Sequence, residues 1–149
     1  MIEFGIENLK PIIFAVYWIV LGAIIAIVLV KLYDIVIFKH IDLQESVQKR
    51  NTSAILFFGL MLIGITSVIG ASIASPSRSS NIVLETASTI GWAIGVSLVG
   101  IIIYYLFDKI LMSQINLEKE VSQGNLAAGL FSGIVYIAIS LIGVAVILS

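Results

Sequence analysis

The sequence predicts an all-α integral membrane protein in which four transmembrane helices are built from a duplicated, parallel two-helix unit. Three observations predict this fold class. Of the 149 residues, 60% are hydrophobic and only 11% are charged, and the mean hydropathy is +1.15, which is not the composition of a soluble domain. The charged residues leave four long uncharged gaps, and the two halves of the chain resemble each other.

The uncharged gaps locate the four predicted helices, because a charge in the middle of a bilayer is costly. The gaps cover residues 11–30, 51–77, 86–107 and 121–149. Each can hold a helix of about 20 residues, the length that crosses a hydrocarbon core of about 30 Å. The apolar runs do not alternate with polar residues, so helices are favoured over the strands of a barrel.

The distribution of positive charge predicts the orientation. Four spans leave both termini on one side of the membrane and the segments 31–50 and 108–123 on the other. Six of the eight Lys and Arg residues lie in these two segments, so the positive-inside rule places both segments in the cytoplasm and both termini outside. Acidic residues precede the first span, which we therefore expect to be a retained helix rather than a cleaved signal peptide.

An internal repeat appears when the chain is shifted by 74 residues. The coincident residues are Trp18/Trp92, Asp34/Asp108, Ile41/Ile115, Leu43/Leu117, Val47/Val121, Asn51/Asn125, Ala54/Ala128, Leu56/Leu130, Phe57/Phe131, Gly59/Gly133 and Ile63/Ile137. We interpret residues 1–74 as a first two-helix repeat, 75–81 as an outer linker and 82–149 as a second repeat. Because each repeat has an even number of spans, the two copies insert in the same direction.

The second copy also carries a familiar motif. Residues 123–129, Gln-Gly-Asn-Leu-Ala-Ala-Gly, follow Leu-Glu-Lys-Glu-Val at 117–121. This pattern resembles the signature of the YjfL-like small inner-membrane family, domain of unknown function 350, over essentially the whole chain. The first copy keeps Asn51 and Ala54 but replaces the glycine. The resemblance implies a bacterial inner-membrane protein linked to membrane maintenance, and it supplies no established activity.

Two pairs of polar residues are the candidate functional groups. Asp34 and Asp108 end the incoming helices, where the helix dipole disfavours a carboxylate. They are either solvated interface charges or a cation-attracting mouth across the pseudo-axis. Asn51 and Asn125 begin the outgoing helices, where an asparagine either caps exposed N–H groups or lines a path for a polar substrate or ion.

Small residues predict close helix packing. Gly91 and Gly95 are four residues apart, as are Gly129 and Gly133, and such spacing lets the backbones of membrane helices approach closely. The partner helix belongs either to the same chain or to a second copy. Intramembrane hydroxyls such as Ser97 and Tyr136 predict a hydrogen-bonded pair between helices, while Tyr33 and Tyr104 are expected in an aromatic belt at the cytoplasmic end.

The composition excludes most enzyme chemistry. The chain has no cysteine and a single histidine, His40, so thiolate metal sites and cysteine nucleophiles are absent and no nucleophile–base pair is visible. We therefore expect no catalytic residues, no metal and no cofactor. A net charge of -1 offers no basic surface for nucleic acid.

These observations predict a non-enzymatic, polytopic inner-membrane protein. We expect it to self-associate and to present amphipathic cytoplasmic loops to lipid or to a cytoplasmic or membrane-associated protein partner, because apolar residues such as Ile41, Leu43 and Val47 lie among charges in these loops. The alternative is an oligomeric ion or small-solute channel with Asp34 and Asp108 at its cytoplasmic mouth.

Overall fold

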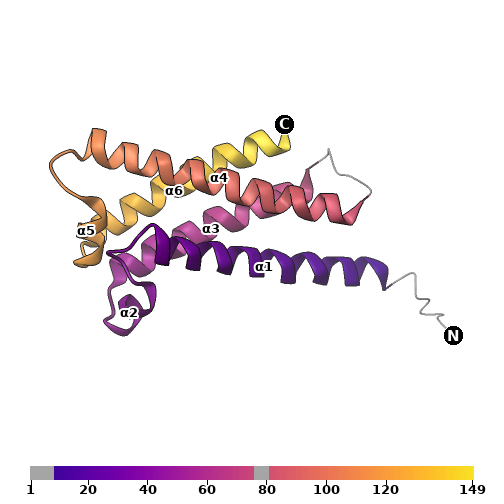
Figure 1. The fold of residues 1–149 in the computed structure, drawn as a ribbon, viewed down its shortest axis with the longest axis horizontal. Helices are drawn as coiled ribbons and strands as arrows, with labels where there is room; N and C mark the ends of the chain where they lie inside the picture. The colour runs from indigo at the N-terminus through magenta and orange to yellow at the C-terminus, as the bar shows by residue number, and fades with distance from the viewer. Residues whose placement is uncertain (1–8, 76–80) are drawn as a thin grey trace.

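The computed structural model describes residues 9–75 and 81–149. The first eight residues and most of the predicted outer linker, 76–80, lie outside the described part. Every regular element in the described ranges is an α-helix (Figure 1). In chain order these are α1 (Lys10–Val36), α2 (Leu43–Gln48), α3 (Thr52–Ala74), α4 (Ile82–Leu111), α5 (Leu117–Ser122) and α6 (Leu126–Leu148).

Four of these helices, α1, α3, α4 and α6, are long and apolar enough to cross a membrane. They confirm the four predicted long apolar helices but not all of the predicted limits. Helices α1 and α4 continue past the charges at Lys31 and Asp108, because a helix does not have to end where its apolar face ends. The predicted fourth span began too early, since residue 121 lies in α5 and α6 begins only after Asn125.

The long helices alternate in direction (Figure 1). Helices α1 and α4 run toward one end of the bundle, and α3 and α6 run back from it. We call residues 37–51 the first connector and residues 112–125 the second connector; they contain α2 and α5, respectively. Both connectors therefore lie at the same end of the bundle, opposite the described chain termini.

Helices α3 and α6 form the most extensive helix pair, with α1 packed on α3 and α4 packed on both. Glycine makes this approach possible. A Cβ atom added at Gly129 would collide with the backbone of Ser53, and one added at Gly133 would collide with the Leu60 side chain. The Gly129–Gly133 spacing thus serves packing within the chain.

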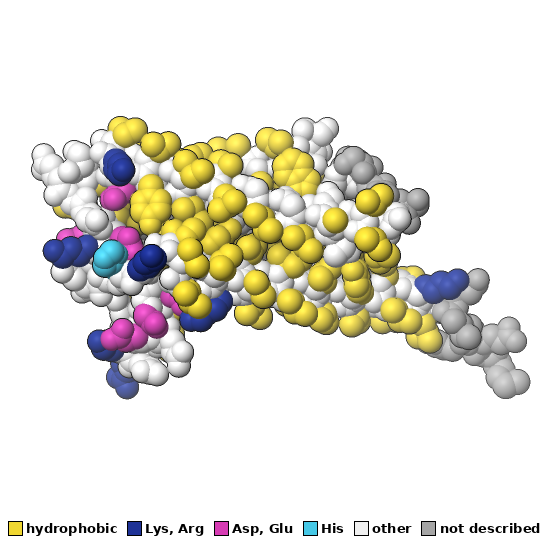
Figure 2. Space-filling view, viewed as in Figure 1, with side chains coloured by type: hydrophobic (Ala, Val, Ile, Leu, Met, Phe, Trp, Pro, Cys, Tyr) yellow, Lys and Arg dark blue, Asp and Glu magenta, His cyan; other side chains and the backbone are white. Residues whose placement is uncertain are grey.

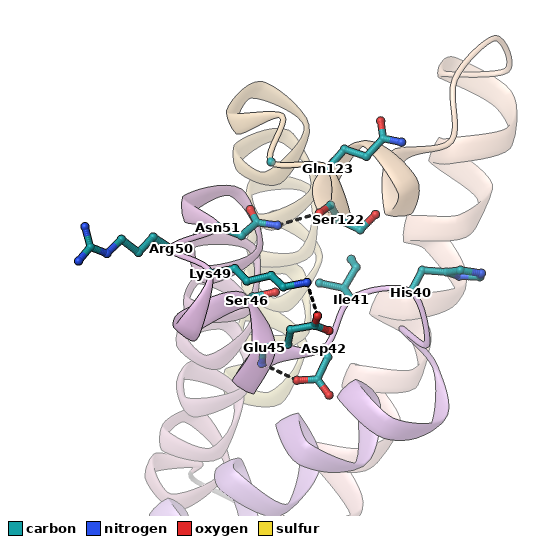
Figure 3. A pocket seen from close by; sticks show the side chains of 11 residues that line it. His40, Ile41, Asp42, Glu45, Ser46, Lys49, Arg50, Asn51, Ser122 and Gln123 are labelled. Atoms are coloured by element: carbon teal, nitrogen blue, oxygen red, sulfur yellow. Dashed lines mark hydrogen bonds and ion pairs between the residues drawn. The ribbon is translucent and has the colours of Figure 1, made fainter.

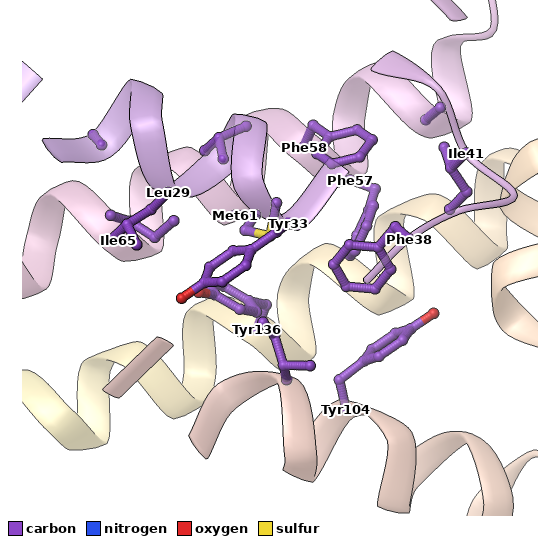
Figure 4. Close-up of a cluster of buried hydrophobic side chains, with 14 of the residues drawn as sticks. Leu29, Tyr33, Phe38, Ile41, Phe57, Phe58, Met61, Ile65, Tyr104 and Tyr136 are labelled. Atoms are coloured by element: carbon purple, nitrogen blue, oxygen red, sulfur yellow. The ribbon is translucent and has the colours of Figure 1, made fainter. Parts of the chain in front are cut away.

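Aromatic rings fill the bundle between its centre and the connector end (Figure 4). The rings of Phe38 and Phe57 meet edge to face with centroids 4.9 Å apart, and Tyr104 lies 5.8 Å from Phe57. Phe38 belongs to the first connector, so the connector is anchored by a ring buried among the helices. Rings in this geometry add specific attraction to their burial.

The outside of the bundle is apolar along its length and charged at the connector end (Figure 2). Helix α1 exposes a continuous aliphatic surface that includes Ile13, Ile19 and Ile27. A large exposed apolar surface of this kind faces lipid in a membrane protein. The charged side chains visible in this view gather mostly at the connector end, away from the apolar surface.

Elements separated by 74 positions have matching local structure. Helices α5 and α6 begin and end 74 positions after α2 and α3. The N–H of Leu43 donates to Asp34 at 2.9 Å, and the N–H of Leu117 donates to Asp108 at the same distance. Arg50 and Gly124, also 74 positions apart, both adopt a positive φ.

Candidate functional site at the connector end

Asp34 lies at the end of α1 with its side chain only 2% exposed. Its carboxylate accepts a hydrogen bond from the Lys31 ammonium at 2.7 Å and from the N–H of Leu43 at 2.9 Å. The lysine compensates the unfavourable position of an acid at a helix C-terminus, and the N–H bond fixes the start of α2. Asp34 therefore holds the first connector against its own helix.

Asp108 has the corresponding position at the end of α4 and is partly exposed. Its carboxylate accepts from the N–H of Leu117. Tyr105 stands where the first repeat has Lys31, so Asp108 lacks the equivalent lysine. The structure engages each of the two acids with its own connector rather than with the other acid.

Asn51 and Asn125 occupy the N-cap positions of α3 and α6. The Asn51 side-chain oxygen accepts from the N–H of Ala54, and that of Asn125 accepts from Ala127 and Ala128. Such caps satisfy helix N–H groups that have no partner in the helix. The amide of Asn125 also donates to the Glu120 carboxylate at 2.8 Å.

Asn51 does more than cap its own helix. Its side-chain amide donates to the carbonyl oxygens of Val121 and Ser122, both at 3.0 Å. A neighbouring residue adds a similar link, because the Ser53 hydroxyl donates to the carbonyl oxygen of Asn125 at 2.6 Å. The start of α3 is thus bonded to the second connector.

His40 joins the two connectors on the other side. Its backbone N–H donates to the Glu118 carboxylate at 3.1 Å, and its ring Nδ1 lies at the same distance from that oxygen. Glu118 is nearly buried, whereas the His40 ring is exposed. The contact was not predicted, because His40 and Glu118 are 78 positions apart and local sequence does not show that they meet.

A polar hollow of about 530 Å³ lies between the connectors (Figure 3). Asp42, which caps α2 by accepting from the N–H of Glu45, lines it together with Lys49. The Lys49 ammonium pairs with the Glu45 carboxylate, and this hydrogen bond raises the pKa of Lys49. The hollow has both charge signs in its wall, which suits a polar group more than a metal ion. No group of three or more His, Asp or Glu residues in the described ranges is placed to hold a metal.

The backbone turns in a left-handed conformation just before α3 and α6. Gly124 has φ of 89° and Arg50 has φ of 56°. Glycine adopts this region without strain, whereas a residue with a Cβ atom does so at a cost. The glycine missing from the first copy of the motif is therefore replaced by an arginine that takes a similar conformation.

The apolar residues of the connectors are divided between the core and the surface. Ile41, Leu117 and Val121 are buried in the bundle, while Val47 and Ile115 are exposed. The three buried side chains pack under the connectors, so of these five residues only Val47 and Ile115 are exposed enough to meet a lipid or protein surface. The exposure of Val47 differs clearly from that of its counterpart in the second repeat, Val121, which is fully buried.

Two tyrosines that were expected in an aromatic belt are buried inside the bundle. Tyr33 and Tyr104 are 2% and 1% exposed, so they belong to the core and not to an aromatic belt. The hydroxyls of Tyr33, Tyr104 and Tyr136 have no hydrogen-bond partner among the described residues. Ser97 lies close enough to Tyr33 and Tyr136 to interact with both phenols, but its own hydroxyl donates to the carbonyl oxygen of Ala93.

Gly91 and Gly95 lie on an exposed side of α4. A Cβ atom at either position would meet open space. With Trp92 and Gly143 they line an apolar groove of about 480 Å³ between α4 and α6. A groove of about 540 Å³ between α1 and α3 contains Trp18 and Gly22. The two predicted glycine pairs therefore differ. Gly129 and Gly133 contact a helix of the same chain, whereas no atom lies close to the Cβ position of Gly91 or Gly95.

Taken together, the four apolar helices and the charged connector end define a helical membrane protein. The model of the family described as Domain of Unknown Function (DUF350) matches residues 6–147. The chain belongs to this family. No curated protein and no solved structure matches the chain.

Proposed function

We propose that the chain is a non-enzymatic inner-membrane protein that self-associates and presents its paired connectors at the cytoplasmic face to lipid or a protein partner. The observation that carries the proposal is the bonding of the two connectors to each other. Asn51 reaches Val121 and Ser122, and His40 reaches Glu118. Because these contacts join residues more than 65 positions apart, they give the connectors a defined common surface.

Charge supports the cytoplasmic placement of this surface. Six of the cations lie in the segments on the connector side of the proposed spans: Lys31, Lys39, Lys49, Arg50, Lys109 and Lys119. The segments on the other side contain only Lys10 and Arg78. Short loops rich in Lys and Arg stay in the cytoplasm. The protein then crosses a bacterial inner membrane with both termini outside the cytoplasm.

The matching local structures support duplication of a two-helix unit. The hydrogen bonds of Asp34 and Asp108 to connector N–H groups correspond across a shift of 74 residues, as do the positive φ values of Arg50 and Gly124. A chance apolar similarity would not reproduce polar turns. We place the two repeats at residues 1–74 and 82–149.

The free glycines support self-association through α4. Membrane helices pack closely where small residues lie four positions apart. Gly129 and Gly133 have such a partner in α3, whereas Gly91 and Gly95 face open space. A second copy that packs its own α4 on this surface would bury the same residues on both chains.

The test compares equivalent substitutions on two lipid-facing surfaces. Gly95→Leu should shift the detergent-solubilised protein toward the monomer in native mass spectrometry while the helical circular dichroism stays unchanged. Gly59→Leu is the matched control, because a side chain at Gly59 also meets open space. An unaltered oligomer in Gly95→Leu, or an equal shift in both variants, would contradict the proposed surface.

The geometry gives the channel alternative less support. A cation mouth needs carboxylates that are free to meet an ion, and the Asp34 carboxylate is buried against Lys31. We expect cation flux into vesicles to be the same for the native chain and for Asp34→Asn with Asp108→Asn. A flux that depends on the two acids would favour the channel over the proposal.

A further inference from the structure

Arg50 has a backbone conformation that a glycine would adopt more easily. Its φ is 56°, and the corresponding residue of the second repeat is Gly124, with φ of 89°. The left-handed turn therefore does not require a side chain at this position. Because an arginine at such a position costs stability, its side chain is the feature that needs an explanation.

Arg50 belongs to the lining of the hollow between the connectors, but its guanidinium is directed out of that hollow. Figure 3 shows it pointing away from His40, Ser122 and Gln123. No carboxylate of the described ranges forms an ion pair with it, in contrast to Lys49, which pairs with Glu45. The guanidinium is an exposed cation that is available to an external partner.

Two residues close to Arg50 in the sequence are also exposed. The Lys49 side chain is 72% exposed and the Val47 residue is 56% exposed. The Lys49 ammonium is turned toward Glu45 and the hollow, whereas Arg50 points away from the hollow (Figure 3), so we call Val47 and Arg50 the α2 tip. The tip lies directly before α3, the helix that re-enters the apolar region at Thr52, and α2 projects sideways from the end of the bundle (Figure 1).

The location selects an anionic lipid headgroup as the occupant. A side chain at the end of a spanning helix lies at the depth of the phosphates, where Lys and Arg bind and an apolar neighbour enters the boundary of the acyl chains. A guanidinium donates two parallel hydrogen bonds to a phosphate. The second connector lacks these features, because it has Gln123 and Gly124 in place of the cations and its Val121 is buried.

We propose that the α2 tip binds the phosphate of anionic phospholipids through Arg50, with Val47 inserted beside the headgroup. The inference rests on the proposed function, since it requires the connectors to lie at a membrane surface. It goes further by naming the lipid class and by assigning binding to the first connector alone. The strained backbone at Arg50 is the structural cost of this site.

The experiment is native mass spectrometry of the full chain released from detergent with phosphatidylglycerol, phosphatidylcholine or inorganic phosphate. The native chain should retain phosphatidylglycerol in preference to phosphatidylcholine. Arg50→Gly should reduce this preference about fivefold, the effect of one cation near a charged surface. Lys119→Gln is the control, because it removes one exposed positive charge from the second connector and should retain the preference.

The outcomes separate this inference from the proposed function. Arg50→Gly relieves backbone strain, so a folding defect is not expected and equal helical circular dichroism checks it. An unchanged lipid preference in Arg50→Gly, an equal loss in Lys119→Gln, or equal competition by inorganic phosphate would each overturn the headgroup site. The same spectra report the oligomer mass, and a native chain that is only monomeric would instead overturn self-association.

Discussion

The side-chain amide of Asn51 donates a hydrogen bond to the carbonyl oxygen of Val121, with 3.0 Å between nitrogen and oxygen. One residue therefore caps α3 and holds the second connector. The two roles use different atoms, because the oxygen of Asn51 accepts from Ala54 and the nitrogen donates to the connector. Substitutions can separate them.

Asn51→Asp keeps the capping oxygen but replaces the donor with a carboxylate facing two carbonyl oxygens. We expect the free energy of unfolding to fall by about 1–3 kcal/mol, measured by reversible denaturation in detergent. Asn116→Asp is the matched control, because Asn116 caps α5 by accepting from Lys119 and the first repeat already has Asp42 at that place. If Asn51→Asp left the free energy of unfolding unchanged, the hydrogen bonds between the connectors would contribute nothing to stability.

The left-handed turn at Gly124 gives a second prediction. Gly124→Ala should lower the free energy of unfolding by about 1–2 kcal/mol, because a Cβ atom is strained at φ of 89°. Gly70→Ala should be neutral or stabilising, since Gly70 is helical and has open space around it. Equal effects of the two alanines on denaturation would argue against strain as the cause.

Close packing of α3 on α6 gives a third prediction. A Cβ atom at Gly129 would meet the backbone of Ser53, which cannot move aside as a flexible side chain can. Gly129→Ala should therefore destabilise the monomer by about 1–3 kcal/mol, whereas Gly91→Ala should leave its unfolding midpoint unchanged or raised. A tolerated Gly129→Ala would mean that the two helices can separate at little cost.

The two aspartates should differ in their contribution to stability. Asp34→Asn loses the charge-assisted bond that the half-exposed Lys31 donates to the buried Asp34 carboxylate, so we expect a cost of about 1–2 kcal/mol. Asp108→Asn should cost less than about 1 kcal/mol, because Asp108 is more exposed and its amide replacement can still accept from Leu117. Thermal unfolding of both variants tests the order, and a larger loss in Asp108→Asn would reverse this assignment.

The four spans could be predicted because charge and apolar length act along the chain itself. The cap positions of Asn51 and Asn125 follow from similarly local chemistry. The burial of Val121 could not be predicted, since Val47 has the corresponding position in the first repeat and is exposed. That difference depends on which side of each short helix meets the bundle.

The partner of His40 and the donor role of Asn51 were also beyond sequence reasoning. Both depend on the docking of two connectors that are far apart in the chain. The same limit applies to the glycine pairs, whose spacing is identical although only Gly129 and Gly133 have partners in the chain. Spacing predicts which residues allow close approach, and only the tertiary structure identifies what approaches them.

The most direct test of this account is the side of the membrane on which each connector lies. The chain has no cysteine, so Gln44→Cys, Ser113→Cys and Ser149→Cys each give a single exposed label site. In intact spheroplasts, a membrane-impermeant maleimide should label only Ser149→Cys, and it should reach Gln44→Cys and Ser113→Cys after the membrane is opened. Labelling of either connector from outside the intact cell, or of the two connectors from opposite sides, would contradict the account.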